Sequence, residues 1–250
     1  MFSIKASDPR APPPVAYHYL VSMALLFPRR SPSLDRLAPN SLLSSWTSVL
    51  TSDYAFYPDI HYQNMTSALI FITNGTEEME FTIAYDTLVR AAIDTTSAGV
   101  DIQSQAVCTR GVKITPDVLL ESLSDDQLSS YDIVVIPGGG PGANTLQANK
   151  RVQKLFQDNY QVKGKLLGTI CAGSLAIKSS GIAKGKAITS HPSVKGELTG
   201  DYAYSEDKVV VTDNLVSSRG PGTAFPFALT LVELALGKEK RDEVAGPMVF

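Results

Sequence analysis

The chain has 250 residues, 44% of them hydrophobic, and a formal net charge of −3. This composition is typical of one globular domain with residues to spare, and the lack of a basic excess argues against a nucleic-acid partner. No apolar run reaches the roughly 18 residues that a membrane helix needs, so we expect no membrane partner either.

The first 64 residues differ in composition from the rest. Eight of the fifteen prolines lie there, and no stretch keeps one hydrophobic period. We expect residues 1–64 to be an extension, disordered or loosely attached, and residues 65–250 to be the folded domain. Met65 is a candidate natural start. The alternatives are an ordered addition, a signal peptide, for which a small-residue cleavage site is missing, and a mitochondrial targeting segment, against which Asp8 and Asp35 argue.

From residue 67 onward, strand patterns alternate with helix patterns. Apolar runs such as 68–72 are typical of strands buried on both faces of a parallel sheet. The predicted strands cover residues 68–73, 95–98, 131–136, 165–170, 186–189, 209–211 and 215–218, with an antiparallel ribbon in 103–115. The predicted helices cover residues 77–92, 115–123, 150–160, 172–180 and 225–236. This alternation predicts an α/β fold, a mostly parallel sheet with helices on both faces, with ligands bound at the carboxyl ends of its strands.

Cys171 lies between a predicted strand and a predicted helix. A nucleophile on a sharp strand-to-helix turn is the arrangement of the nucleophile elbow. The start of a helix beside the sulfur favours the thiolate, and Gly173 leaves room for a tight turn. The alternative is a buried structural cysteine.

Other turns of the same sheet edge carry three further groups. Glu77 and Glu78 suit a solvated helix start, which Thr76 would cap, whereas Glu80 lies one turn further in. The glycine run 138–140 lacks the lysine of a phosphate loop, so we interpret it as an oxyanion-binding turn or as a plain tight turn. His191 follows a short strand, and such a histidine is commonly structural or exposed.

Taken together, five stretches resemble the DJ-1/PfpI superfamily, and within it the DJ-1 branch. They occur in the expected order and at compatible spacing, and the resemblance extends over residues 66–250. The stretches are 75–80, 135–139, 170–173, 191–192 and 218–223. The resemblance implies a single flavodoxin-like sandwich domain with a cysteine nucleophile elbow.

The resemblance also implies roles for individual residues. Cys171 corresponds to the reactive, easily oxidised cysteine, Glu80 to the glutamate that hydrogen-bonds the sulfur when protonated, and His191 to the histidine near the sulfur. The implied surroundings are Gly138, Gly139 and Ala172 lining the pocket, Arg90 and Arg110 near it (one of them across a dimer interface), and Cys108 near that interface.

The implied function is that of a glutathione-independent glyoxalase, or D-lactate dehydratase, which converts methylglyoxal or glyoxal through a Cys171 hemithioacetal. Protein deglycation is a related activity, and the resemblance implies no cofactor or metal, a homodimer, and a cytoplasmic and nuclear location. The alternative function is a redox-sensing chaperone that uses oxidisable Cys171. A cysteine peptidase is disfavoured, because Ala172 stands where PfpI-type peptidases carry a histidine.

Overall fold

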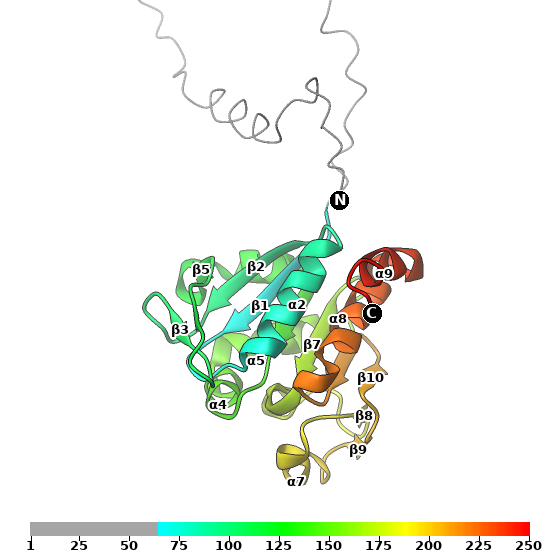
Figure 1. Cartoon of the computed structure of the whole chain (residues 1–250). Coiled ribbons are helices and arrows are strands. Elements are labelled where there is room, and N and C mark those ends of the chain that lie inside the picture. Colours follow the sequence, from blue (N-terminus) through cyan, green and yellow to red (C-terminus); the bar gives the residue numbers. More distant parts are fainter. Residues whose placement is uncertain (1–64) are drawn as a thin grey trace, which may run out of the picture. The chain divides into compact units, whose positions relative to one another are not determined.

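The computed structural model describes residues 65–250, so the predicted N-terminal extension lies outside the described residues. The described part contains a seven-stranded sheet in the order β10-β11-β7-β6-β1-β2-β5 (Figure 1). All neighbouring pairs are parallel except β10 and β11. The strands are β1 Ser67–Ile72, β2 Asp94–Gly99, β5 Val118–Leu119, β6 Ile133–Ile136, β7 Leu166–Ile170, β10 Val209–Thr212 and β11 Leu215–Ser218.

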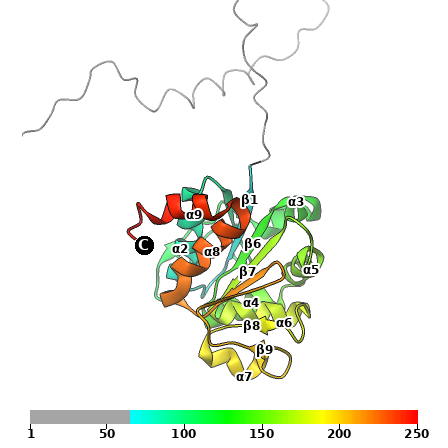
Figure 2. The same cartoon turned by 90° about the vertical axis from the view of Figure 1, so that its right-hand side faces the viewer.

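Helices cover both faces of this sheet, as Figure 2 shows. One layer contains α2 Glu78–Arg90, α8 Ala224–Leu236 and α9 Lys238–Ala245. The other contains α3 Asp125–Ser130, α4 Gly140–Ala148, α5 Lys150–Asn159 and α6 Leu175–Ser180. Along β1, Leu69 and Phe71 face the α4–α6 layer, whereas Ile70 and Ile72 face α2 and α8. The predicted fold class is confirmed.

Smaller elements lie outside the main sheet. The predicted antiparallel ribbon is β3 Ala106–Val107 with β4 Lys113–Ile114. A second pair, β8 Ala187–Ile188 with β9 Ala203–Tyr204, is parallel. The remaining helical segments are α7 Lys195–Leu198 and the 3₁₀ turns η1 Leu120–Ser122, η2 Cys171–Ser174, η3 Pro192–Val194 and η4 Pro221–Thr223.

One predicted helix is wrong, and three helices of the two layers, α3, α4 and α9, were not predicted. The helix expected at 115–123 is instead the edge strand β5, paired with β2, followed by η1, because a short apolar run suits either structure and the sheet edge offers it a partner. Helix α4 begins inside the glycine run, and α3, which Ser124 caps, was not predicted. Helix α9 was also missed.

The path of the chain through the sheet places the site. From central β1 the chain runs outward to β2 and β5, and then returns past β1 to β6, β7 and β11. The turns after β1 and β6 therefore diverge from a topological switch point, where open α/β sheets bind ligands. Glu77 N–H donates to the carbonyl of Gly138 at 3.0 Å, which ties these two turns together.

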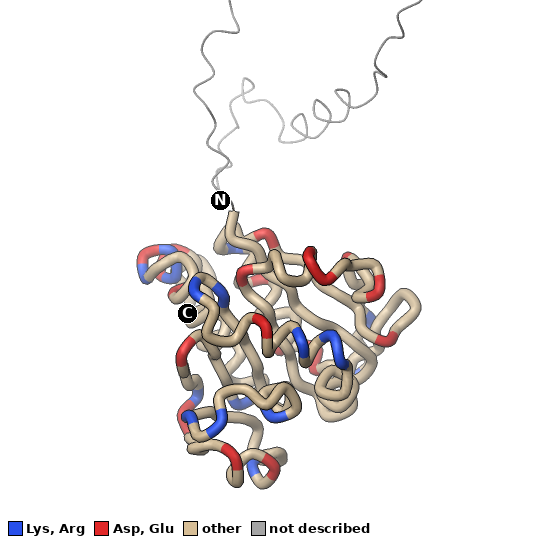
Figure 3. The backbone as a smooth tube through the Cα atoms, turned by 180° about the vertical axis from the view of Figure 1, so that it is seen from behind, with Lys and Arg blue, Asp and Glu red and all other residues tan. Residues whose placement is uncertain are grey.

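No helix among residues 65–250 is both long and apolar enough to cross a membrane. Basic and acidic residues are interspersed along the backbone on the face that Figure 3 presents.

Candidate functional site

Cys171 is the first residue of η2, between β7 and α6, so the predicted elbow is present. Its φ is 61°, in the left-handed region that residues other than glycine seldom occupy. Gly173 makes this turn possible, because a Cβ there would lie 2.6 Å from the carbonyl oxygens of Ile136 and Pro137. A strained backbone at a partly exposed cysteine is a mark of a functional site.

Glu80 is fully buried near the start of α2. Its Oε2 accepts a hydrogen bond from Gly138 N–H at 2.7 Å, and its own N–H donates to Glu77 Oε2 at 2.8 Å. Glu77 is therefore the helix cap, whereas the hydroxyl of Thr76, the predicted cap, accepts from Thr73 N–H instead. Oε1 of Glu80 has no hydrogen-bond partner within the described residues, which leaves it able to carry a proton.

The Glu80 carboxyl and the Cys171 thiol determine each other's protonation. Burial raises the pKa of Glu80 to about 7, against the hydrogen bond from Gly138. Burial and the Glu80 charge raise the pKa of Cys171 to about 12, against the N–H groups of Ala172 and Gly139. The start of the helix lowers the pKa of Cys171 through the Ala172 N–H, in the direction that the sequence indicated, but burial and the Glu80 charge outweigh this effect. A thiolate here requires the proton to reside on Glu80, as one tautomer of the singly deprotonated pair.

Gly138 is the point where the groups meet. A Cβ on Gly138 would lie 2.6 Å from Cys171 Cβ and 2.7 Å from Glu80 Oε2. On another side of the site, a Cβ on Gly220 would lie 3.5 Å from the His191 ring and 3.9 Å from Glu80 Oε1. The site therefore lies where the segments that follow β6, β7 and β11 meet the start of α2.

His191 contacts the elbow through its backbone, because its N–H donates to the Cys171 carbonyl at 3.3 Å. Nδ1 of the ring accepts from Ser193 N–H at 3.2 Å and lies 2.8 Å from the Ser193 hydroxyl. A neutral ring that accepts at Nδ1 carries its proton on Nε2. His191 therefore offers a donor at Nε2.

These groups open onto a cleft of about 710 Å³, within the usual range for small-molecule sites. Five predicted residues line it, and Gly138 and Glu80 lie behind it. The lining residues are Glu77, Thr109, Arg110, Gly139, Gly140, Asn144, Cys171, Ala172, Leu175, His191, Ser193, Val194, Glu197 and Pro221. Sequence reasoning missed Asn144 because it lies on the unpredicted α4, and Ser193 because only the ring contact identifies it.

Arg110 reaches the mouth of the cleft on the turn between β3 and β4. Glu78 holds this turn, accepting from Arg110 N–H at 2.9 Å and from the Thr109 hydroxyl at 2.7 Å. The Arg110 guanidinium lies 3.8 Å from Glu77 Oε1. Glu77 and Glu78 are only 4% and 8% exposed, so the prediction that they are solvated is wrong.

Arg90 is not part of this cleft. It is the last residue of α2, about 15 Å along the helix from Glu80, and its guanidinium binds Asp86 at 2.6 Å. A contribution from Arg90 across a dimer interface stays a prediction. Cys108 is buried, and burial together with Glu78 and Glu77 raises the pKa of its thiol to about 11. Residues 65–250 contain no group of three His, Cys, Asp or Glu side chains placed to hold a metal ion.

Comparison with known proteins agrees with this geometry. The model of the DJ-1/PfpI family matches residues 66–234. Protein dj-1beta of Drosophila melanogaster is 44% identical over 180 residues, 72% of this chain and 94% of that protein. The glutathione-independent glyoxalase DJ-1 of Schizosaccharomyces pombe is 38% identical over 185 residues, 72% of this chain and 96% of that protein.

A solved structure of Schizosaccharomyces pombe DJ-1 superposes with a TM-score of 0.71 at 36% identity, covering 74% of this chain and 99% of that one. The chain belongs to the DJ-1/PfpI family. Its relatives include proteins named as glutathione-independent glyoxalases, which supports an enzymatic role at the level of the family.

Proposed function

We propose that the protein is a glutathione-independent glyoxalase (D-lactate dehydratase) that converts methylglyoxal to lactate on Cys171. The observation that supports this most is a buried carboxyl with a pKa of about 7 beside a cysteine sulfur that opens to a cleft. A carboxyl that titrates near neutrality is suited to donate and accept protons at physiological pH.

The first step forms the hemithioacetal. The proton of the Cys171 thiol passes to Glu80, and the sulfur attacks the aldehyde carbon. The N–H groups of Gly139 and Ala172, which face the sulfur, stabilise the oxygen anion that forms on that carbon. Glu80 then gives its proton to this oxygen, which completes the adduct and leaves the Glu80 carboxylate ionised for the next step.

The next steps move a proton between two carbons. Glu80 removes the hydrogen from the carbon bonded to sulfur, which gives an enediol, and the proton returns to the neighbouring carbon. His191 Nε2 gives its proton to the ketone oxygen and takes one back from the hydroxyl on the sulfur-bearing carbon, which becomes the thioester carbonyl. The product is a lactoyl thioester, and water cleaves the carbon–sulfur bond to release lactate and restore the thiol.

The cleft is much larger than a three-carbon aldehyde, at about 710 Å³. This space admits an aldehyde adduct carried on a protein side chain, so deglycation of such adducts belongs to the same proposal.

A second candidate is an oxidation sensor, and a specific observation favours it. Glu80 Oε1 is buried and has no hydrogen-bond partner in the described part of the chain. A protonated Oε1 would donate to the oxygen of a sulfinic acid formed on Cys171, and this bond would favour that oxidation state. The protein would then act as a redox-responsive chaperone.

The decisive measurement is lactate formed from methylglyoxal by the full chain without glutathione. Cys171→Ser should abolish turnover, and Glu80→Gln should lower kcat about a hundredfold or more, because Gln cannot exchange protons. Cys108→Ser, which removes the other thiol, is the matched control and should retain the wild-type rate. Full activity in Cys171→Ser would refute the thiol mechanism. No turnover in the wild type, with selective oxidation of Cys171 by mild peroxide, would favour the sensor.

A further inference from the structure

The segment that leads to His191 is held by side chains. Strand β8 ends at Ile188, and the peptide groups of Thr189 bind two serine hydroxyls. Thr189 N–H donates to Ser217 Oγ at 3.0 Å, and its carbonyl accepts from Ser174 Oγ at 3.1 Å. Thr189 is therefore fixed from both sides, two residues before the ring of His191.

Both serines are buried and belong to elements of the site. Ser174, 0% exposed, is the last residue of η2, which begins at Cys171, and Ser217, 1% exposed, lies on β11. The hydroxyl of Thr169, on β7, lies 3.3 Å from Ser174 Oγ. A chain of hydroxyls thus links β7 and the elbow to the backbone before His191.

The residue between Thr189 and His191 is also anchored. The Tyr204 hydroxyl donates to the Ser190 carbonyl at 2.9 Å, and His191 N–H reaches the Cys171 carbonyl at 3.3 Å. Hydroxyl-to-peptide bonds are directional, and breaking one in the interior leaves a buried group unpaired. These bonds therefore determine where the three residues 189–191 lie relative to the elbow.

We propose that Ser174 and Ser217 are positioning residues, which hold the Thr189 peptide and, through it, the His191 ring at a fixed place beside Cys171. Both serines are buried and neither lines the cleft, so neither is placed to contact a substrate there. Part of the test rests on the proposed glyoxalase function, because it uses kcat, whereas the state of the His191 ring is measured without any turnover.

The experiment compares Ser174→Ala, Ser217→Ala and Ser180→Ala in the full chain. Ser180 is the matched control, because it is a buried serine on α6 whose hydroxyl has no hydrogen-bond partner among residues 65–250. The first readout is the pair of ring ¹⁵N signals of His191, assigned through His191→Gln among the three histidines of the chain. The second is the separation of kcat from KM.

In the wild type and in Ser180→Ala, the two ring nitrogens should give well-separated signals, as a single tautomer with its proton on Nε2 requires. In Ser174→Ala and Ser217→Ala, the signals should move toward each other as the ring samples both tautomers. In these variants kcat should fall roughly tenfold with KM changed less than about twofold, because a displaced group lowers the rate of the chemical step.

The proposal is overturned if both serine variants keep the wild-type ring signals and kcat and only lower Tm, since the hydroxyls would then be purely structural. If one variant fails to fold, the other decides the question, because it removes the serine hydrogen bond on the opposite side of Thr189. If the wild type makes no lactate but the ring signals converge as described, the positioning role holds and the glyoxalase function falls.

Discussion

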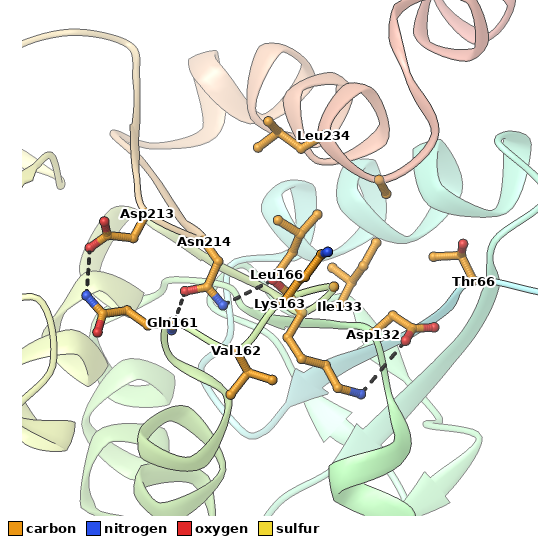
Figure 4. Close-up of a pocket in the computed structure, with 13 residues that line it drawn as sticks. Thr66, Asp132, Ile133, Gln161, Val162, Lys163, Leu166, Asp213, Asn214 and Leu234 are labelled. Carbon is orange, nitrogen blue, oxygen red and sulfur yellow. Dashed lines mark hydrogen bonds and ion pairs between the residues drawn. The ribbon is translucent and has the colours of Figure 1, made fainter.

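Two clefts of similar size lie at the opposite ends of the strands of the sheet. The cleft at Cys171 occupies about 710 Å³ at the carboxyl ends of the strands, and the second occupies about 780 Å³ at their amino ends (Figure 4). The second cleft is lined by residues that precede β1, β6 and β7 and by the β10–β11 turn. Volume alone would therefore point to the cleft at the amino ends, although the reactive groups lie at the carboxyl ends.

In the cleft at the amino ends of the strands, called the amino-edge cleft from here on, most of the polar groups bind one another or nearby carbonyls. Lys165 Nζ donates to three carbonyls at the end of α3, at 2.8 to 3.1 Å. Asn214 accepts from Gln161 N–H (Figure 4). Its side-chain amide also donates to the carbonyls of Asn159 and Lys165. Such groups are already satisfied, so they have little to offer a ligand.

At the carboxyl edge the opposite holds. Glu80 keeps a buried oxygen without a partner in the described residues, Cys171 adopts a strained backbone, and burial raises both pKa values. Unpaired polar atoms, strain and shifted pKa values at one place each destabilise the fold slightly. Their coincidence marks a functional site better than volume does.

The largest expected difference between the two clefts comes from adding one methyl group at each. Gly138→Ala places a Cβ against Cys171 and Glu80 and should lower kcat about a thousandfold, because both reacting groups are displaced. The Cβ of Gly164→Ala meets no atom of residues 65–250 within 4 Å, but its φ of 83° strains an alanine, so the free energy of unfolding should fall by about 1 kcal/mol with kcat unchanged. Wild-type turnover in Gly138→Ala, measured as lactate formation, would contradict the site.

The sequence was sufficient for the central strands β1 and β6, because each contains a continuous apolar run, but not for the edge strand β5. It also placed Cys171 at an elbow, since strand, turn and helix patterns are all local there. The sequence-based prediction failed where contacts between distant segments determine whether a residue is buried. Glu77 and Glu78 are charged residues at a helix start, and only the neighbouring β3–β4 turn buries them.

The same limit applies to electrostatics. A helix start beside Cys171 argued for a thiolate, but the sequence cannot give the depth of burial or the distance to Glu80, which together dominate. The hydrogen bonds of Ser174 and Ser217 to Thr189 could not be predicted either. The two serines lie more than 40 positions apart in the sequence and come together only when β11 packs beside β7.

The buried carboxyl should also make stability depend on pH. Glu80 has a folded-state pKa of about 7, above its ordinary value of 4.5, so between these values the folded state holds a proton that the unfolded state has lost. The free energy of unfolding should therefore fall by about 3 kcal/mol as pH rises through this window. Glu80→Gln should remove this fall, whereas Glu121→Gln, at an exposed position, should retain it. The free energy of unfolding is measured with denaturant at about pH 4.5 and about pH 8. An equal change between these pH values in the wild type and in Glu80→Gln would contradict the prediction.

The smallest expected effect tests the amino-edge cleft itself. Lys165→Met keeps the apolar stem but removes the three bonds to the carbonyls that end α3, so the free energy of unfolding should fall by about 1–2 kcal/mol. Lys163→Met, in the same cleft, removes an exposed charge for which the described residues supply no hydrogen bond, and should leave stability unchanged. Both variants should convert methylglyoxal at the wild-type rate. A loss of kcat in either one, at unchanged fold, would mean that the amino edge takes part in function, and that satisfied polar groups do not identify an inactive cleft in this protein.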